Sequence, residues 1–209
     1  MVRSAVAILV LLALAAGCGT ETEPQTDERA QAGTGAHELP PVPDRVPITP
    51  RAVAAIALDH LPQNTSSREA MYTDKRDAPG TLGADLGYNA TGEYDGDSLS
   101  VALAPGERDL DCEISHCANL DTDVENASMV LVWQELEPEE DPGIVTVLLY
   151  RDGEKAWVHQ SWEEITGDPR DLNLQISVDE MVEILEDPWL RLETSPDAIA
   201  AGERLEDWG

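Results

Sequence analysis

One stretch in the second half of the chain constrains its fold more than any other. Two strand-like runs, 144–151 and 154–162, flank the dipeptide Asp152-Gly153. Asp-Gly in this setting is a strong signal for a β-hairpin with a two-residue turn. Such a turn gathers six side chains on the expected core face: Val145, Val147, Leu149, Ala156, Val158 and Gln160. On the opposite face the expected pairs are Tyr150 with Lys155, Leu148 with Trp157, and Thr146 with His159.

Further runs extend this hairpin into a sheet. Residues 84–94 and 98–104 flank Asp95-Gly96 and predict a second hairpin, with these facing pairs: Tyr88 and Leu103, Ala90 and Val101, Gly92 and Leu99. Residues 129–136 are expected to run antiparallel to 144–151, and 69–73 to form a short edge strand. The expected fold is α+β, with an antiparallel sheet of about five or six strands built from hairpins.

Helix signals occur on both sides of the strand region. Thr49-Pro50 supplies a hydroxyl N-cap and a first-turn proline, and Pro62 ends that helix. Ser177 and Glu180 form a capping box that opens a helix ending at Asp187-Pro188. Ser195-Pro196 begins a last short helix to about Leu205. We therefore expect an N-terminal helix and one or two C-terminal helices to pack on the sheet.

The N-terminus is typical of an export signal. Arg3 precedes an uncharged apolar run, 5–16, which is shorter than the ~20 residues of a membrane-spanning helix. The residues 14–18, Leu-Ala-Ala-Gly-Cys, resemble a bacterial lipobox, so we expect cleavage before Cys18 and lipidation of that cysteine. The alternative is an ordinary signal peptide in which Cys18 is incidental.

Three segments follow from this reading. Residues 1–17 are the signal peptide, 18–48 the lipidated cysteine and a disordered Pro-rich tether, and 49–209 a single α+β globular domain. The tether is rich in proline and small or polar residues, and cannot bury enough apolar surface to offset its ordering entropy. The predicted location is the extracytoplasmic face of the cell membrane.

The charge of the chain restricts its partners. Its formal net charge of −29 becomes −30 when the signal peptide, with its one base Arg3, is removed. Nucleic acids and anionic lipid surfaces both require a positive protein surface, so neither is an expected partner. Contact with the membrane should come from the lipid on Cys18.

Cys112 and Cys117 are the cysteines outside the lipobox. In an oxidising compartment the default for such a pair is a disulfide bond. The alternative is a metal site that includes His116, but a structural zinc site needs four ligands and this segment offers three. We expect the disulfide, and we expect no metal and no cofactor.

Two acidic segments are weak candidates for calcium binding. Residues 121–126 begin like a calcium loop, but Asn126 stands where glycine is needed and Val132 where the bidentate glutamate should be. A second segment places five acids near Pro138: Glu135, Glu137, Glu139, Glu140 and Asp141. We interpret both as solvated loops.

No catalytic residue is predicted. The chain contains no G-x-S-x-G, H-E-x-x-H, P-loop or dinucleotide fingerprint. Glu163 and Glu164 should point to opposite faces of a strand, and His159 is interpreted as a packing or surface residue. Trp157 is expected to be core, covered by the C-terminal helices; an exposed aromatic patch there would instead mark a partner or ligand site.

The order of these parts resembles the small lipoproteins of filamentous actinobacteria. The likeness rests on the lipobox at Cys18, the tether, the Cys112–Cys117 loop, the hairpin around Asp152-Gly153 and the helix that ends at Asp187-Pro188. Those proteins are mostly uncharacterised. The resemblance therefore implies an envelope location and an α+β domain, and it implies no activity.

Three classes of function remain. The first is a non-enzymatic binding or structural module of the cell envelope, whose partner is an envelope protein or a small molecule. The second is an envelope hydrolase with an unrecognised site. The third is a small-molecule or metal-binding lipoprotein, for which the chain is short if two lobes are required.

Overall fold

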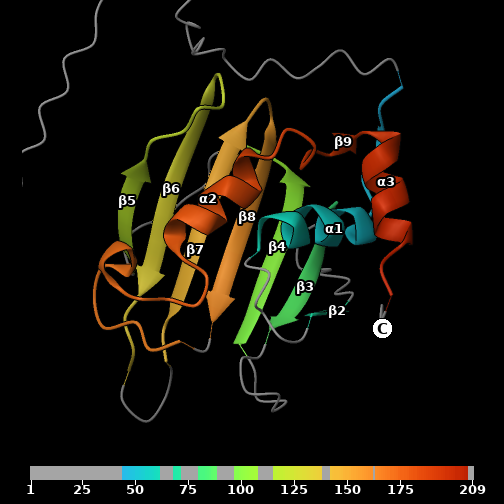
Figure 1. Cartoon of the computed structure of the whole chain (residues 1–209). Helices are drawn as coiled ribbons and strands as arrows, with labels where there is room; N and C mark the ends of the chain where they lie inside the picture. Colours follow the sequence, from blue (N-terminus) through green and yellow to red (C-terminus); the bar gives the residue numbers. More distant parts are fainter. Residues whose placement is uncertain are drawn as a thin grey trace, which may run out of the picture. The chain divides into compact units, whose positions relative to one another are not determined.

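The computed structural model describes residues 44–61, 68–71, 80–88, 97–107, 115–137, 142–161 and 163–206 (Figure 1). The predicted signal peptide, Cys18 and nearly all of the predicted tether lie outside these residues. The described part of the chain belongs to one compact unit, Gly35–Gly209.

The main element is an antiparallel sheet of seven strands. Its spatial order is β2-β3-β4-β8-β7-β6-β5, so two meanders meet where β4 pairs with β8. The strands are β2 (Arg68–Met71), β3 (Leu82–Tyr88), β4 (Asp97–Pro105), β5 (His116–Leu120), β6 (Ala127–Gln134), β7 (Ile144–Arg151) and β8 (Glu154–Ser161). The α+β class and the antiparallel sheet are confirmed, and the strand that the sequence analysis did not identify is β5.

The β7–β8 hairpin has the predicted register. Arg151 lies opposite Glu154 across the two-residue turn, and Leu148 lies opposite Trp157. Both turn residues have positive φ, 47° at Asp152 and 76° at Gly153. This is the left-handed geometry that a two-residue hairpin turn requires and that Asp-Gly adopts readily.

The predicted register of the β3–β4 hairpin is wrong. Leu86, not Gly92, lies opposite Leu99, and the last described pair of this register is Tyr88 with Asp97. Asp95-Gly96 is therefore not a two-residue turn; it lies in the connection 89–96, outside the described residues. The observed register is shifted from the predicted one by an even number of residues. The side chains of β4 therefore still point to the face of the sheet that was predicted for them.

The three predicted helices are present: α1 (Pro50–His60), α2 (Val178–Glu186) and α3 (Pro196–Glu203). The side chains of Thr49 and Ser195 accept from backbone N–H groups three residues ahead, and Ser177 and Glu180 form the capping box. Each such cap contributes roughly 1 kcal/mol to helix stability. A 3₁₀ turn, η1 (Pro169–Asp171), precedes α2.

Helices α1 and α2 lie on the same face of the sheet (Figure 1). Helix α1 packs on β3 and β4, and α2 packs on β7 and β8. The core between them and the sheet includes these fully buried side chains: Leu86, Leu99, Leu131, Leu149, Ile165, Met181, Ile184 and Leu185. Trp157 points to the other side of the sheet and is half-buried, so the expectation that the C-terminal helices cover it is wrong.

A second, two-stranded sheet ties the start of the described fold to its end. Strand β1 (Val46–Pro47) pairs with β9 (Glu193–Thr194), inside the segment predicted as tether. Next to it, α3 packs closely on α1, where a Cβ built on Gly202 would lie 2.6 Å from the backbone of Arg51. Arg51 also donates from Nε to the carbonyl of Gly202 at 3.0 Å.

Candidate functional site

The face of the sheet opposite α1 and α2, here the helix-free face, carries a row of polar side chains across four adjacent strands. The row consists of Asp85 on β3, Ser100 on β4, His159 on β8 and Thr146 on β7. Each is the direct cross-strand neighbour of the next. Cross-strand neighbours have Cβ atoms ~5 Å apart, so the four functional groups lie within reach of one another.

Two hydrogen bonds organise this polar row. The hydroxyl of Ser100 donates to Oδ1 of Asp85, and Nδ1 of His159 lies 2.9 Å from Oγ1 of Thr146. Ser100 is 8% exposed, whereas the other three residues are half-buried. A serine hydroxyl has one proton to donate. In this contact the proton of Ser100 is directed to the Asp85 carboxylate.

Other hydroxyl and amide groups continue the polar surface toward one end of the sheet. Ser98 and Ser161 lie 3.4 Å apart through their hydroxyls, and Nε2 of Gln134 donates to Oγ of Ser115 at 3.2 Å. Farther along the same face, Tyr150 is 6% and Val130 2% exposed. The helix-free face is therefore covered in part by the chain itself, and it is not a continuous open surface.

Sequence reasoning predicted one of these pairs. Thr146 opposite His159 follows from the two-residue turn. Asp85 opposite Ser100 was missed because the expected register of the first hairpin placed Thr91 there. The alternation of apolar and polar residues was correct in both hairpins, and only the turn length separates the success from the failure.

The strongest electrostatic cluster lies at the β7–β8 turn. Nε of Arg151 lies 3.1 Å and Nε of Arg191 2.6 Å from the same oxygen of Glu154. Arg151 also donates to the carbonyls of Leu185, in the last turn of α2, and of Leu190, which follows α2. Its side chain is 2% exposed. This cluster holds the C-terminal end of α2 on the hairpin, and we assign it a structural role.

Burial lowers the pKa of Arg151 below its ordinary value, and the neighbouring charge of Arg191 adds to that effect. Glu154 opposes the shift through its charge and its hydrogen bond. A buried cation with a paired carboxylate is stabilised far better than an isolated one. Arg151, Arg191 and Glu154 therefore form one ionic cluster, in which the loss of one charged side chain would destabilise the others.

A second ionic contact joins the two helices. Nε2 of His60, at the end of α1, lies 2.9 Å from Oδ2 of Asp187, which follows α2. This hydrogen bond is the largest cause of a raised pKa at His60; burial opposes it, and the nearby carboxylates of Glu183 and Asp59 support it. The protonated imidazole is thus the form that stabilises the contact.

His116 and Cys117, which are neighbours in β5, point to opposite faces of the sheet. His116 lies opposite Trp133 on the helix-covered face, and their rings stack with centroids 5.2 Å apart. Cys117 is the next residue in the strand, so its side chain points to the other face. Neighbours on opposite faces cannot bind one metal ion together. Cys112 lies outside the described residues, so its pairing with Cys117 stays a prediction; two free thiols in the unreduced protein would contradict it.

The predicted acidic loop is held by a residue of α2. Oε1 of Glu186 accepts from Oγ1 of Thr122 at 2.7 Å and from the backbone N–H of Asp123 at 3.0 Å. Asn126 has a φ of 56°, which allows the turn without glycine. Within the described ranges, no group of three or more His, Cys, Asp or Glu side chains is placed to bind a metal ion.

No helix among the described residues is both long and apolar enough to cross a lipid bilayer. Comparison with known proteins adds no family: no family model, no curated protein and no solved structure matches the chain. The assignment of a function therefore rests on the residues and their geometry.

Proposed function

We propose that the chain is a lipid-anchored protein of the cell envelope whose α+β domain is a non-enzymatic binding or structural module. Acyl chains on Cys18 would hold it at the extracytoplasmic face of the membrane. The lipobox at residues 14–18 supports the anchor. Because the chain is strongly negative, an anionic lipid surface would not attract it, and its contact with the membrane would depend on these acyl chains.

The observation that carries the non-enzymatic part is the hydrogen bond from Ser100 to Asp85. Ser100, His159 and Asp85 are the residue types of a hydrolase triad, and they are neighbours in the polar row. In a triad, however, the carboxylate orients the imidazole, and the imidazole receives the serine proton. Here the carboxylate receives that proton directly, and Thr146 contacts Nδ1 of the imidazole.

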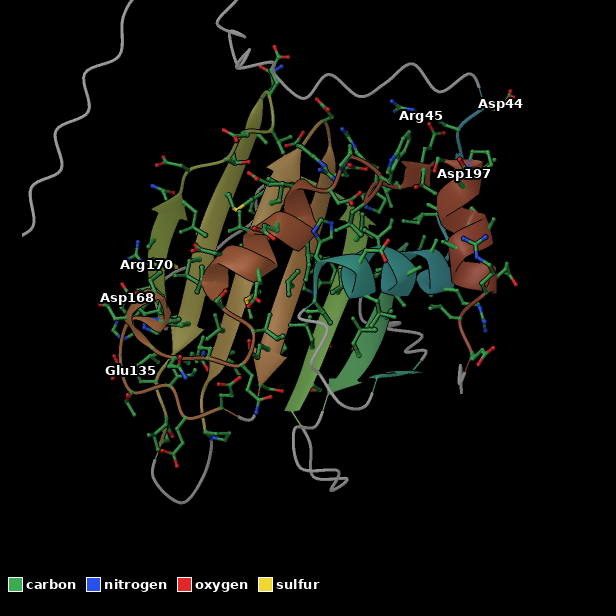
Figure 2. The ribbon with its side chains drawn as sticks, viewed as in Figure 1. Asp44, Arg45, Glu135, Asp168, Arg170 and Asp197 are labelled. Carbon is green, nitrogen blue, oxygen red and sulfur yellow. The ribbon has the colours of Figure 1, made fainter. Side chains whose placement is uncertain are left out.

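The attachment of β1 to β9 suits a tethered domain. Within the segment predicted as tether, 18–48, the chain enters the small sheet with Glu193–Thr194 at Val46–Pro47. Tension on the tether would therefore be shared with the C-terminal segment. Figure 2 places Asp44 and Arg45 at this end of the domain, near Asp197 of α3.

Two experiments test the proposal. Cells that express the full chain or its Cys18→Ala variant are fractionated; we expect the native chain with the membranes and the variant outside them. A variant that still fractionates with membranes would contradict the anchor.

The second experiment measures the hydrolysis of p-nitrophenyl esters of several chain lengths by the purified full chain and by its Ser100→Ala variant. Turnover that disappears in the variant would contradict the non-enzymatic role.

A further inference from the structure

Negative charge is distributed unevenly over the described part of the domain. The acidic region, residues 115–137 and 163–186, includes β5, β6, η1 and α2. It carries thirteen carboxylates and one base, Arg170, so its formal net charge is −12. The tether region, residues 44–60 and 193–206, includes β1, α1, β9 and α3. It carries six carboxylates and three arginines, so its formal net charge is −3.

The charges of the acidic region lie at the surface. None of its thirteen carboxylates is buried. Its one base, Arg170, donates from Nε to Asp168 at 2.9 Å and is therefore paired within the region. In the tether region, by contrast, Arg45 and Arg204 are exposed. The surfaces of the two regions therefore differ in charge as their compositions do.

The two regions lie on different sides of the domain. Strands β5 and β6 are at the edge of the seven-stranded sheet that is farthest from β2 and β3. Helix α2 joins that side through Glu186, which accepts from Thr122 at 2.7 Å. Helix α3 packs on α1, and α1 packs on β3 and β4. Figure 2 shows the two sides by their labelled side chains: Glu135, Asp168 and Arg170 on one, and Asp44, Arg45 and Asp197 on the other.

The segment predicted as tether enters the domain in the less acidic region, through β1. An anionic lipid surface would repel the two regions unequally. Its potential falls off within a Debye length, ~8 Å at physiological salt, so the region nearer the lipid contributes most of the repulsion. At equal distance the acidic region, with about fourfold the net charge, would be repelled more strongly.

We propose that a negatively charged membrane orients the anchored domain, so that the tether region faces the lipid and the acidic region faces away from it. This inference rests on the proposed function, because the domain must be held close to the membrane by Cys18 to be exposed to this field. The tether predicted from the sequence would leave the domain free to turn. Electrostatic repulsion would then select among its orientations without direct contact.

The test uses the full chain, purified from membranes in detergent and inserted into preformed vesicles. Two variants each carry one dye-labelled cysteine at an exposed, uncharged position: Asn173→Cys in the acidic region and Ala200→Cys in the tether region. The native chain, taken through the same labelling, reports any dye on its own cysteines. Energy transfer to an acceptor on the lipid headgroups measures how close each position comes to the membrane.

The measured quantity is the ratio of energy transfer at Ala200→Cys to energy transfer at Asn173→Cys. We expect the ratio to be higher, by roughly twofold or more, on vesicles of equal parts phosphatidylglycerol and phosphatidylcholine than on phosphatidylcholine alone. It should return to the phosphatidylcholine value in about 1 M NaCl, where the Debye length is ~3 Å.

Matched charge variants separate orientation from net charge. Neutralising four exposed carboxylates of the acidic region should lower the ratio on anionic vesicles: Asp121→Asn, Asp123→Asn, Glu125→Gln and Glu183→Gln. Neutralising four exposed carboxylates of the tether region should raise it: Asp44→Asn, Glu193→Gln, Glu203→Gln and Glu206→Gln. Both sets change the net charge by the same amount. A melting curve for each variant confirms that it is folded.

Three outcomes would overturn the inference. They are the same ratio on both kinds of vesicle, a lower ratio on the anionic vesicles, and equal changes of the ratio by the two sets of substitutions. A chain that does not float with the vesicles would contradict the anchor itself, and this inference with it. Flotation is measured before energy transfer, so failure of the anchor is distinguished from failure of the orientation.

Discussion

Strands β3 and β4 carry α1, and β7 and β8 carry α2, so each half of the sheet combines one hairpin with one helix. The halves differ in how their register is fixed. The β7–β8 hairpin turns in two residues, and Arg151 and Glu154 beside the turn bind the last turn of α2 and the segment after it. The described β3–β4 pairing reaches Tyr88 and Asp97, and the turn between these two strands lies within 89–96, outside the described residues. Turn length, more than hydrophobic pattern, decides whether register can be predicted.

Composition adds to this difference. Strand β7 reads Ile-Val-Thr-Val-Leu-Leu-Tyr-Arg, with four β-branched residues that pack well in a pleated sheet. Strand β3 has none and contains Gly83 and Gly87. A Cβ built on Gly83 would lie 2.7 Å from the Cβ of Ala102, so glycine allows a close approach of β3 and β4. Neither glycine fixes register, since a strand with few side chains specifies its partner weakly.

The largest expected effect distinguishes the two possible registers of β3 with β4. Engineered cysteine pairs should cross-link in one register and not in the other. Asp85→Cys with Ser100→Cys places two cysteines on Cα partners of the observed register, so they should cross-link under mild oxidation. Thr91→Cys with Ser100→Cys represents the register that Asp95-Gly96 predicts, and it should not cross-link. Peptide mapping distinguishes the two. Cross-linking of the second pair alone would show that the β3–β4 register described above is wrong.

Much of the fold was predictable from local signals. The caps at Thr49, Ser177 and Ser195 each lie within a few residues of the helix they begin, and Asp152-Gly153 fixes every pair of its hairpin. Of the two hydrogen-bonded pairs in the polar row, only Thr146–His159 could be predicted. The Asp85–Ser100 pair depends on the register of β3 with β4, which the sequence between these strands did not fix. Strand β5 was not predicted, because the segment from Cys112 to Cys117 was interpreted as a disulfide-linked loop. No local pattern announces the contact between Arg151 and the carbonyl of Leu185, because 34 residues separate them.

Removing the buried cation should have the largest effect on stability. Arg151→Met leaves Glu154 with one arginine and removes the donors to two carbonyls, so we expect a loss of about 3 kcal/mol. Urea unfolding of the full chain measures the change. The control is Arg170→Met, because Arg170 is exposed and an exposed ion pair such as that with Asp168 contributes little to stability. Equal effects of the two changes would exclude Arg151 as the residue that holds α2 on the hairpin.

The turn itself should have a smaller effect. Gly153→Ala places a side chain at a φ of 76°, which costs about 1 kcal/mol, although no atom lies within 4 Å of the added Cβ. Gly167 also has open space around it and no left-handed φ, so Gly167→Ala is a control for the added methyl alone. We expect Gly167→Ala to be neutral or slightly stabilising in the same unfolding assay. A neutral Gly153→Ala would contradict the role given to the turn.

The smallest expected effect concerns the contact between the two halves. The pKa of His60 is raised in the folded protein, so its contact with Asp187 contributes most below the unfolded pKa, ~6.5. The contribution is lost as the pH rises through the folded pKa. The free energy of unfolding should therefore decline more steeply in the native chain than in His60→Gln over this pH range. Identical pH profiles of the free energy of unfolding would show that the His60–Asp187 contact does not contribute to stability.

We propose that the first residue of the mature chain is a lipidated cysteine, Cys18. Mass spectrometry of the N-terminal peptide from membrane-purified protein tests this directly. The peptide should begin at Cys18 and carry the added mass of fatty acyl chains. A peptide that begins at Met1, or one with an unmodified Cys18, would contradict it.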